Sequence, residues 1–454
     1  MNIRPKFKKS FYILFFCDIL KINLRKINYG VDKMNDIIRK EIADGVFFNS
    51  VSDSRFKTMR ITANIITPLS AQTASENALL CGILSRSCKA YPDFTALSRK
   101  LAFLYGADIN TSVSKGGDRQ ILGISASGLD DRYALDGESI SEELSQLLCG
   151  VIFEPNLSGE CFVEEEVEQE RRQLLDVIDS EFNEKRIYAN GQMIKHMCEG
   201  ETFGVKRYGT AEKINEATPA SLFRAWQRLL KSATFEIMYI GDSSPDKAEE
   251  VFRAAFEKIS RKPEKIEVSN VRRADSVKRV SEEMELSQSK LVMGFRTDCS
   301  EPDPEVNAER VMCAILGGTA SSKLFCNVRE KQSLCYYCAS RYDRQKGIMI
   351  VDSGVEGENI EKAEKGIMKE IEDMQNGNIT DFELESAKMA IVNSFSSTND
   401  TVGGIEAWYT NQLFDDSFKS VEEVSKMINA VTKDEVVAAA KKLTLDTVYV
   451  LKNK

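Results

Sequence analysis

Hydrophobic residues in the first half of the chain follow first the period of strands and then the period of helices. Apolar and polar positions alternate in residues 56–66, as in a half-buried strand, and apolar residues recur at helical spacing in 75–86. Gly106 follows a second helical pattern, which is typical of a helix end. The pattern predicts strand, helix, helix, strand, strand and helix over residues 56–66, 75–86, 94–105, 108–114, 120–127 and 133–150.

The second half of the chain repeats this order of elements. Strand, helix, helix, strand, strand and helix are predicted over residues 291–295, 304–315, 321–331, 335–342, 347–354 and 358–375. An internal repeat of this kind predicts two similar α+β domains in one chain.

The predicted domains cover residues 34–245 and 286–454, with a helix and a charged linker over 246–285. The first domain is expected to open with a short helix-like piece after Met34. Thr218-Pro219 predicts a helix start, with threonine as the cap and proline in the first turn.

Residues 1–33 are interpreted as a non-structural N-terminal extension. A signal or membrane anchor is the alternative, carried by the apolar run 11–20. That run contains Asp18 and is short for a membrane-spanning helix. Lys21 and Arg25 follow it in place of a small-residue cleavage site, which favours the extension.

Composition narrows the class of protein and its partners. With 42% hydrophobic and 29% charged residues, the chain has the composition of a soluble globular protein. Its formal net charge of -9 argues against a nucleic-acid partner, because phosphate binding needs a basic face, and against an anionic membrane surface. The 11 cysteines lack a disulfide-like rhythm, which predicts free thiols and a cytoplasmic location.

The chain of 454 residues has a single histidine, His196. Zinc peptidase sites of the H-E-x-x-H and H-x-x-E-H types need two imidazoles one helical turn apart, so this chain cannot build one. His196 has no acidic residue beside it that would orient a general base. We interpret it as a structural or surface residue.

The passage 77–88 keeps the apolar frame of a well-known metal-binding helix without its ligands. It resembles the zinc helix of the insulinase-type (M16) metallopeptidases, the group of mitochondrial processing peptidase and pitrilysin, whose core is H-x-x-E-H. The resemblance places the first histidine at Ala78, the glutamate at Cys81 and the second histidine at Gly82. None of the three chemical groups is present.

Two further passages carry the same resemblance. Residues 168–178 keep the pair Glu170-Arg171 and are similar to the helix that brings the third zinc ligand, whose position falls at Val177. The passages 316–325 and 328–336 resemble the family's second-domain signature. There an arginine and a tyrosine reach toward the bound peptide; the corresponding residues are Arg329 and Tyr336.

The resemblance implies two domains of the M16/LuxS-like metallohydrolase fold, each a mainly antiparallel sheet packed against helices. It also implies no zinc in this chain and no peptidase activity of the chain alone. More narrowly, the chain resembles the non-catalytic member of bacterial M16 pairs, with a zinc-bearing M16 subunit as partner and an extended peptide as ligand. The alternatives are a peptide-binding or scaffold homodimer without that partner, and an enzyme with unfamiliar chemistry at Cys81.

Two cysteine pairs are candidates for other chemistry. Cys81 and Cys88 are two helical turns apart, about 10 Å in a straight helix, which is too far for one tetrahedral zinc ion. Cys335 and Cys338 have redox spacing but lie in a predicted strand, where residues three apart face opposite sides. Both pairs are therefore interpreted as ordinary thiols.

Overall fold

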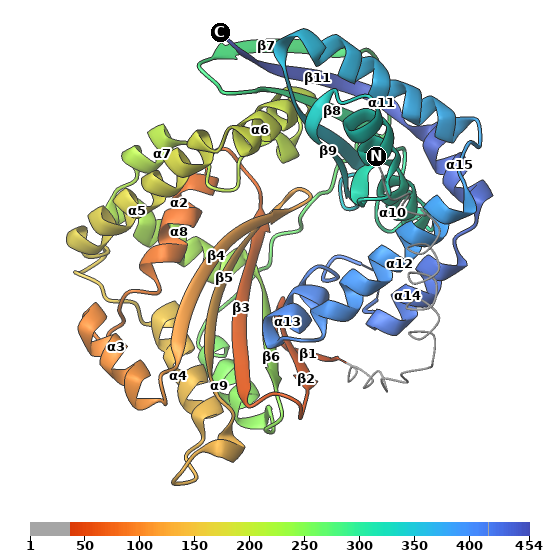
Figure 1. Cartoon of the computed structure of the whole chain (residues 1–454). Coiled ribbons are helices and arrows are strands. Elements are labelled where there is room, and N and C mark those ends of the chain that lie inside the picture. Colours follow the sequence, from red (N-terminus) through yellow and green to blue (C-terminus); the bar gives the residue numbers. More distant parts are fainter. Residues whose placement is uncertain (1–36, 416) are drawn as a thin grey trace, which may run out of the picture. The chain divides into compact units, whose positions relative to one another are not determined.

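Two β-sheets organise the part of the chain that the computed structural model describes, residues 37–415 and 417–454 (Figure 1). Each sheet is packed against helices, and the α+β fold class is confirmed. The extension expected at residues 1–33 lies outside the described residues.

The first sheet has six strands in the order β1-β2-β6-β3-β5-β4. All neighbouring strands are antiparallel except β2 and β6, which are parallel. The strands are Ile38–Ala43 (β1), Val46–Ser52 (β2), Thr58–Pro68 (β3), Asp108–Gly116 (β4), Arg119–Leu129 (β5) and Thr234–Gly241 (β6). In β3 the alternating apolar residues of the sequence pattern all enter the core: Met59, Ile61, Ala63 and Ile65.

Helices of the first half bury their apolar sides against this sheet and each other. Thr218 caps α8 in a capping box with Ser221, and Pro219 stands in its first turn, as predicted. The helices are Ala74–Ile83 (α2), Phe94–Phe103 (α3), Ile140–Phe153 (α4), Glu164–Asn183 (α5), Lys185–Met197 (α6), Ala211–Glu216 (α7), Pro219–Ser232 (α8) and Asp246–Phe256 (α9), with short 3₁₀ turns at Asp131–Tyr133 (η1) and Thr202–Gly204 (η2).

The second sheet has five strands in the order β7-β11-β8-β10-β9. Only the pair β7 and β11 is parallel among its described strands. The strands are Lys278–Met284 (β7), Ser289–Arg296 (β8), Cys335–Asp343 (β9), Ile348–Val355 (β10) and Thr444–Asn453 (β11). Both sheets are therefore mainly antiparallel, as the family resemblance implies.

Helices of the second half cover one face of this sheet. Capping boxes begin three of them, at Thr380 with Glu383, at Ser420 with Glu423 and at Thr432 with Glu435. The helices are Val306–Cys313 (α10), the π-helical segments Ala314–Gly318 (η3) and Leu324–Lys331 (η4), the 3₁₀ turn Gly357–Asn359 (η5), Ile360–Gln375 (α11), Asp381–Thr398 (α12), Val402–Thr410 (α13), Val421–Ala430 (α14) and Lys433–Lys442 (α15).

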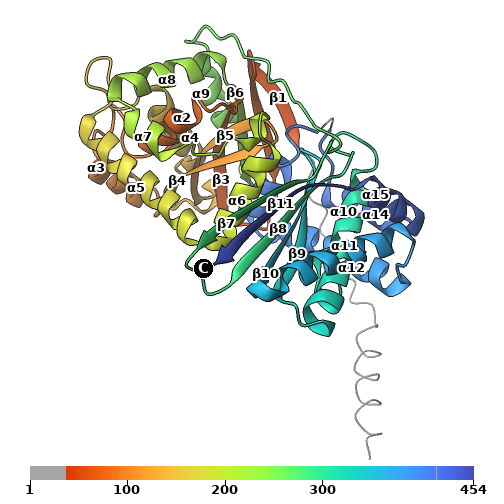
Figure 2. The ribbon, with the colours of Figure 1, turned by 90° about the horizontal axis from the view of Figure 1, so that it is seen from above.

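The other face of the second sheet is covered by α6, a helix of the first half (Figure 2). Met193 and Met197 of α6 pack over Gly294 of β8, where an added Cβ would lie 2.6 Å from either methionine sulfur. In the opposite direction α13 packs on the first sheet, where Glu406 pairs with Arg60 of β3. Each half of the chain thus contributes a helix to the other sheet.

The predicted repeat of elements is present in both halves. The order β3, α2, α3, β4, β5, α4 in the first half corresponds to β8, α10, η4, β9, β10, α11 in the second. The helix expected in segment 246–285 is α9, which packs into the first core, and the end of the expected charged linker forms β7, which joins the second sheet.

One prediction near the start of the described chain is wrong. The helix-like piece expected after Met34 is strand β1 instead, paired with β2. Arg39 of β1 stacks on Phe47 of β2 and forms an ion pair of 2.6 Å with the buried Glu236 of β6. These contacts with residues far along the sequence outweigh the local preference of a short, charged segment.

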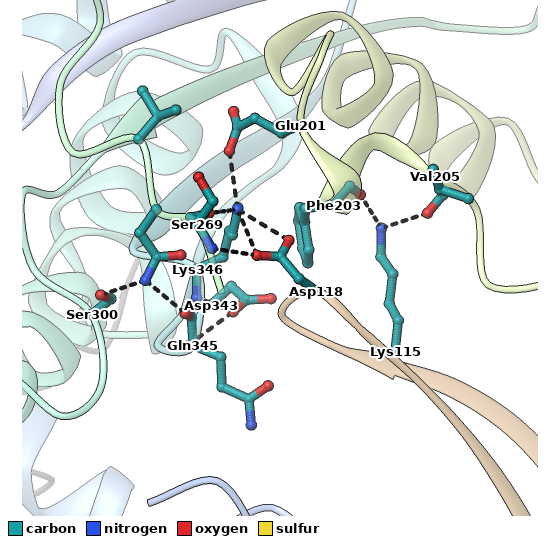
Figure 3. A network of polar contacts seen from close by, with 12 residues as sticks. Lys115, Asp118, Glu201, Phe203, Val205, Ser269, Ser300, Asp343, Gln345 and Lys346 are labelled. Carbon is teal, nitrogen blue, oxygen red and sulfur yellow. Dashed lines mark hydrogen bonds and ion pairs between the residues drawn. The ribbon is translucent and has the colours of Figure 1, made fainter. Parts of the chain in front are cut away.

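A buried ion cluster ties the two halves within the compact unit 35–454 (Figure 3). Lys346, at the turn between β9 and β10, is fully buried and lies 3.2 Å from Asp118 of the β4–β5 turn and 3.1 Å from Glu201. Glu201 also pairs at 2.6 Å with the buried Arg296. Charges without water are stable only when paired, so this cluster fixes the two hairpins relative to each other.

Candidate functional site

The helix that resembles a zinc helix, α2, is buried almost throughout and offers no metal ligand at the three key positions. Ala78 is 4% exposed and Cys81 is 1% exposed. The Cys81 thiol points at two backbone carbonyl oxygens, of Ser112 at 3.7 Å and of Gly123 at 3.8 Å. Burial, reinforced by the nearby Glu170 carboxylate, raises the pKa of Cys81 to about 12. A buried thiol that is held in its neutral form is a poor nucleophile and a poor zinc ligand.

Glu170 of α5 occupies the space beside the third key position, Gly82. A Cβ added to Gly82 would lie 2.0 Å from the Glu170 Oε1 atom. The other carboxylate oxygen lies 3.3 Å from Arg86 Nη1. Burial raises the pKa of Glu170, and the Arg86 cation opposes this shift. An ion pair therefore stands where a histidine at position 82 would need room.

The position where the resemblance places the third zinc ligand also lacks a donor. Val177 lies two turns beyond Glu170 on α5 and is 41% exposed. Over residues 37–415 and 417–454, no three His, Cys, Asp or Glu side chains are grouped so as to hold a metal ion. A methyl group, a high-pKa thiol, a glycine and a valine do not fit zinc, which takes thiolate, imidazole or carboxylate. We therefore derive no zinc chemistry for this chain.

The edge strand β4 runs beside α2 and pairs with β5 along one side. No other described strand pairs with its second edge. Its residues alternate between exposed and half-buried, from Asp108 to Ser114. The unpaired backbone groups of such an edge are able to bind an extended peptide.

Comparison with known proteins shows which proteins this chain resembles. Residues 216–391 match the family described as "Peptidase M16 inactive domain". Over 408 residues the chain is 29% identical to the "Probable inactive metalloprotease YmfF" of Bacillus subtilis (strain 168), covering 90% of this chain and 96% of that protein. The chain is therefore similar to proteins that are described as inactive relatives of the M16 metallopeptidases.

Solved structures show the same fold. A conserved protein from Enterococcus faecalis V583 superposes with a TM-score of 0.87 at 29% identity, covering 92% of this chain and 99% of that one. A peptidase M16 inactive domain from Pseudomonas fluorescens superposes with a TM-score of 0.75 at 20% identity, covering 92% and 98%. The resemblance to the M16 metallopeptidases is thus confirmed, and the matching family model and the Bacillus relative are both described as inactive.

Arg329 and Tyr336, the residues expected to contact peptide, lie at the outer edge of the second sheet. Arg329 is on η4, with its guanidinium 4.5 Å from the centre of the Phe325 ring and 3.5 Å from the Glu330 carboxylate. Tyr336 is on the edge strand β9, is 62% exposed and donates a hydrogen bond of 2.8 Å to Glu356. Both side chains are accessible, and their contact with peptide stays a prediction.

Cys335 and Cys338 depart from the expectation that residues three apart in a regular strand face opposite sides. A β-bulge places Val355 opposite Cys335 but Gly354 opposite Tyr337, so one extra residue separates the two thiols along β9. A bulge of this kind reverses the alternation of sides. Cys335 and Cys338 interact, and hydrogen bonding from Cys338 lowers the pKa of the half-buried Cys335 to about 7.

His196 stands in the last turn of α6, where it stacks on Tyr449 of β11 at a ring distance of 6.2 Å. Its contact is with the second sheet, in keeping with a structural residue.

No described helix is long and apolar enough to cross a bilayer.

Proposed function

We propose that this M16 homologue is a non-catalytic, peptide-binding subunit of a heteromeric peptidase. The observation that carries the proposal is the position of α2 beside β4 together with the side chains that surround it. The helix keeps its place beside the edge strand β4, but a thiol and an ion pair occupy the region of the zinc site. The surface for an extended peptide is thus kept while the chemical groups for its hydrolysis are lost.

Peptide binding is supported by two separate features. The edge of β4 offers backbone donors and acceptors for an added strand. Arg329 and Tyr336 offer a forked cation and a flat ring with a polar tip at an accessible edge of the second sheet. An unfolded peptide can pair with the edge of β4 because its backbone donors and acceptors are free. The same extended chain can contact Arg329 and Tyr336.

A zinc-bearing M16 partner is supported by the size and organisation of the chain. Family members enclose a peptide between two halves, each built from two such domains, and this chain of 454 residues supplies two domains. The partner would bring the zinc ion, its ligands and the glutamate that activates water. The ten cysteines at described positions are free, which supports assembly in the cytoplasm.

Co-expression with an M16 chain that carries an intact H-x-x-E-H motif tests this proposal. We expect a stable 1:1 complex by light scattering, with chelator-sensitive cleavage of an unfolded peptide. We expect no such cleavage by this chain alone. A homodimer that ignores the M16 neighbour would support the stand-alone scaffold, and chelator-sensitive cleavage by the lone chain would overturn the proposal.

A further inference from the structure

A cavity of about 860 Å³ opens at the end of β4, next to the position of the missing third zinc ligand. Its volume lies in the range of small-ligand sites, about 300–1,000 Å³. Its walls come from the end of β4, the end of α5, most of α6, the loop 204–209 and one residue of β9, Arg341. Sequence reasoning missed this site because these segments are distant along the chain.

The cavity is lined by more cations than anions, although the chain as a whole carries a net charge of -9. Two acidic residues line it, Asp179 and Glu181. The lining cations are Lys115, Arg186, Lys206, Arg207 and Arg341. A local excess of positive charge on an acidic protein favours an anionic ligand at this place.

Two of these cations are already neutralised. Arg186 forms an ion pair with Asp352, and Arg207 forms one with Glu181. Asp179, the other acidic residue of the lining, pairs with no described cation. The charge available to a ligand therefore comes from the three other cations and is reduced by Asp179.

Arg341 is the one arginine among these three lining cations. Its guanidinium contacts the amide oxygen of Asn190 at 2.5 Å, and no described carboxylate lies within ion-pair distance of it. Arg341 is exposed on β9, so a ligand can reach its guanidinium. The surrounding protein lowers the pKa of Arg341, and the Asp352 carboxylate opposes this shift. An accessible planar guanidinium binds a carboxylate through two parallel hydrogen bonds.

Lys115, near the end of β4, also lines the cavity. Its ammonium donates to the backbone oxygens of Phe203 at 2.7 Å and Val205 at 3.3 Å (Figure 3). Burial lowers the pKa of Lys115 to about 8, so most of the group is still positively charged at pH 7. Because Ser114 and Lys115 of the edge strand line the cavity, a peptide added along β4 would end beside it.

Apolar side chains complete the lining. Phe182 is 44% exposed and Ile187 is 51% exposed, and both face the cavity together with Tyr188. Exposed aromatic and aliphatic groups beside a few polar ones are typical of a specific ligand site. A bare inorganic anion would leave these apolar groups in water, whereas an amino-acid residue would cover them.

We infer that this cavity binds a carboxylate of the peptide that pairs with β4, with Arg341 as its principal partner. The inference rests on the proposed peptide-binding function and specifies the ligand as an acidic peptide. The carboxylate comes either from an Asp or Glu side chain or from the peptide C-terminus.

Binding of fluorescent, unstructured peptides to the full chain tests the inference. Four peptides of one backbone are compared by anisotropy: one with an internal glutamate and an amidated end, its glutamine counterpart, the glutamine peptide with a free C-terminus, and a lysine counterpart. We expect a carboxylate-bearing peptide to bind about tenfold more tightly than the amidated glutamine peptide, and the preference to shrink in high salt. Whichever carboxylate gives the gain identifies its source.

Arg341→Gln supplies the matched variant, with Arg99→Gln on the exposed surface of α3 as control. We expect Arg341→Gln to remove the carboxylate preference while neutral peptides bind as before, and Arg99→Gln to change neither. Circular dichroism verifies that both variants fold. If peptides bind without any carboxylate preference, or if Arg341→Gln leaves the preference intact, the inference fails alone. If no peptide binds, the proposed peptide-binding function fails with it.

Discussion

Glu170 and Gly82 occupy complementary positions across the interface of α5 and α2. The Glu170 carboxylate lies where the first side-chain atom of any larger residue at position 82 would stand, 2.0 Å from an ideal Cβ. The absence of a side chain at position 82 is thereby coupled to the placement of Glu170. The combined changes Ala78→His, Cys81→Glu and Gly82→His would not be enough to rebuild a zinc site, because Glu170 has to move first.

A double-mutant cycle measures this relationship. Gly82→Ala alone should lower the free energy of unfolding, because it displaces Glu170 from Arg86. In a Glu170→Ala background the same change should raise it by about 0.5–1 kcal/mol, since alanine is the better helix former. Urea denaturation of the four proteins should give a coupling energy of about 1 kcal/mol or more.

Gly191→Ala in α6 is the control for this cycle. A Cβ at Gly191 would meet no heavy atom within 4 Å, so the change should stabilise in both backgrounds. Additive effects of Gly82→Ala and Glu170→Ala would show that the two residues are not coupled.

Glu309 of α10 should make the stability of the protein depend on pH. It is fully buried, and neither of its carboxylate oxygens has a hydrogen-bond partner in the described part of the chain. Burial raises the pKa of Glu309 to about 8; Lys442 opposes the shift, while Glu305 and Asp298 add to it. The folded state thus keeps a proton that the unfolded state loses near pH 4.5. Stability from this group is complete below that pH and is lost as the pH rises toward 8, by up to about 1.4 kcal/mol per pH unit.

Glu309→Gln should remove this slope. The variant should match the wild type near pH 5 and be the more stable protein at pH 9, because glutamine stays neutral. Denaturant midpoints measured from pH 5 to pH 9 test the prediction. Parallel curves for the two proteins would contradict it.

Lys346 should be essential for joining the two halves of the chain. Lys346→Met leaves Asp118 buried without its cation, and we expect a loss of about 3–5 kcal/mol in the free energy of unfolding. Adding Asp118→Asn should recover part of this loss, because the amide carries no charge to desolvate. Thermal unfolding of the single and double variants checks both statements; a loss below about 1 kcal/mol for Lys346→Met would refute the role of the ion cluster.

Cys335 should be among the most reactive thiols of the protein. Its lowered pKa of about 7 and half-buried position give a substantial fraction of thiolate near neutral pH, whereas burial raises the pKa of Cys81 and Cys313 to about 12. Peptide mapping after brief iodoacetamide treatment at pH 7 should show Cys335 modified well before those two. Cys338→Ala should slow the reaction because it removes the hydrogen bond to the thiolate, and an unchanged rate would exclude that interaction.

Arg329 and Tyr336 should contribute to peptide binding without affecting the fold. Arg329→Gln and Tyr336→Phe remove a charge and a hydroxyl from accessible side chains. We expect each to weaken binding of an unfolded peptide by several-fold in the assembled complex, with unchanged complex mass and melting temperature. Unchanged affinity in both variants would remove these residues from the peptide site.

The sequence by itself determined the features that depend on local interactions. The repeat of strands and helices was readable because each element buries one face, and the capping boxes at Thr380 and Thr432 were readable because their hydrogen bonds span three residues. The absence of imidazole and carboxylate groups at Ala78, Cys81 and Gly82 followed from residue identity, since no packing creates an imidazole.

The tertiary structure decided what depends on residues distant along the chain. Strand β1 exists because β2 and Glu236 stabilise it, and the Cys335 thiol reaches Cys338 because a bulge against β10 reverses the strand's alternation. The cavity around Arg341 arises where the halves meet, and the ion pair beside Gly82 forms between two helices. The energies of such contacts depend on distance in space and on the exclusion of water, which a linear pattern of residues does not record.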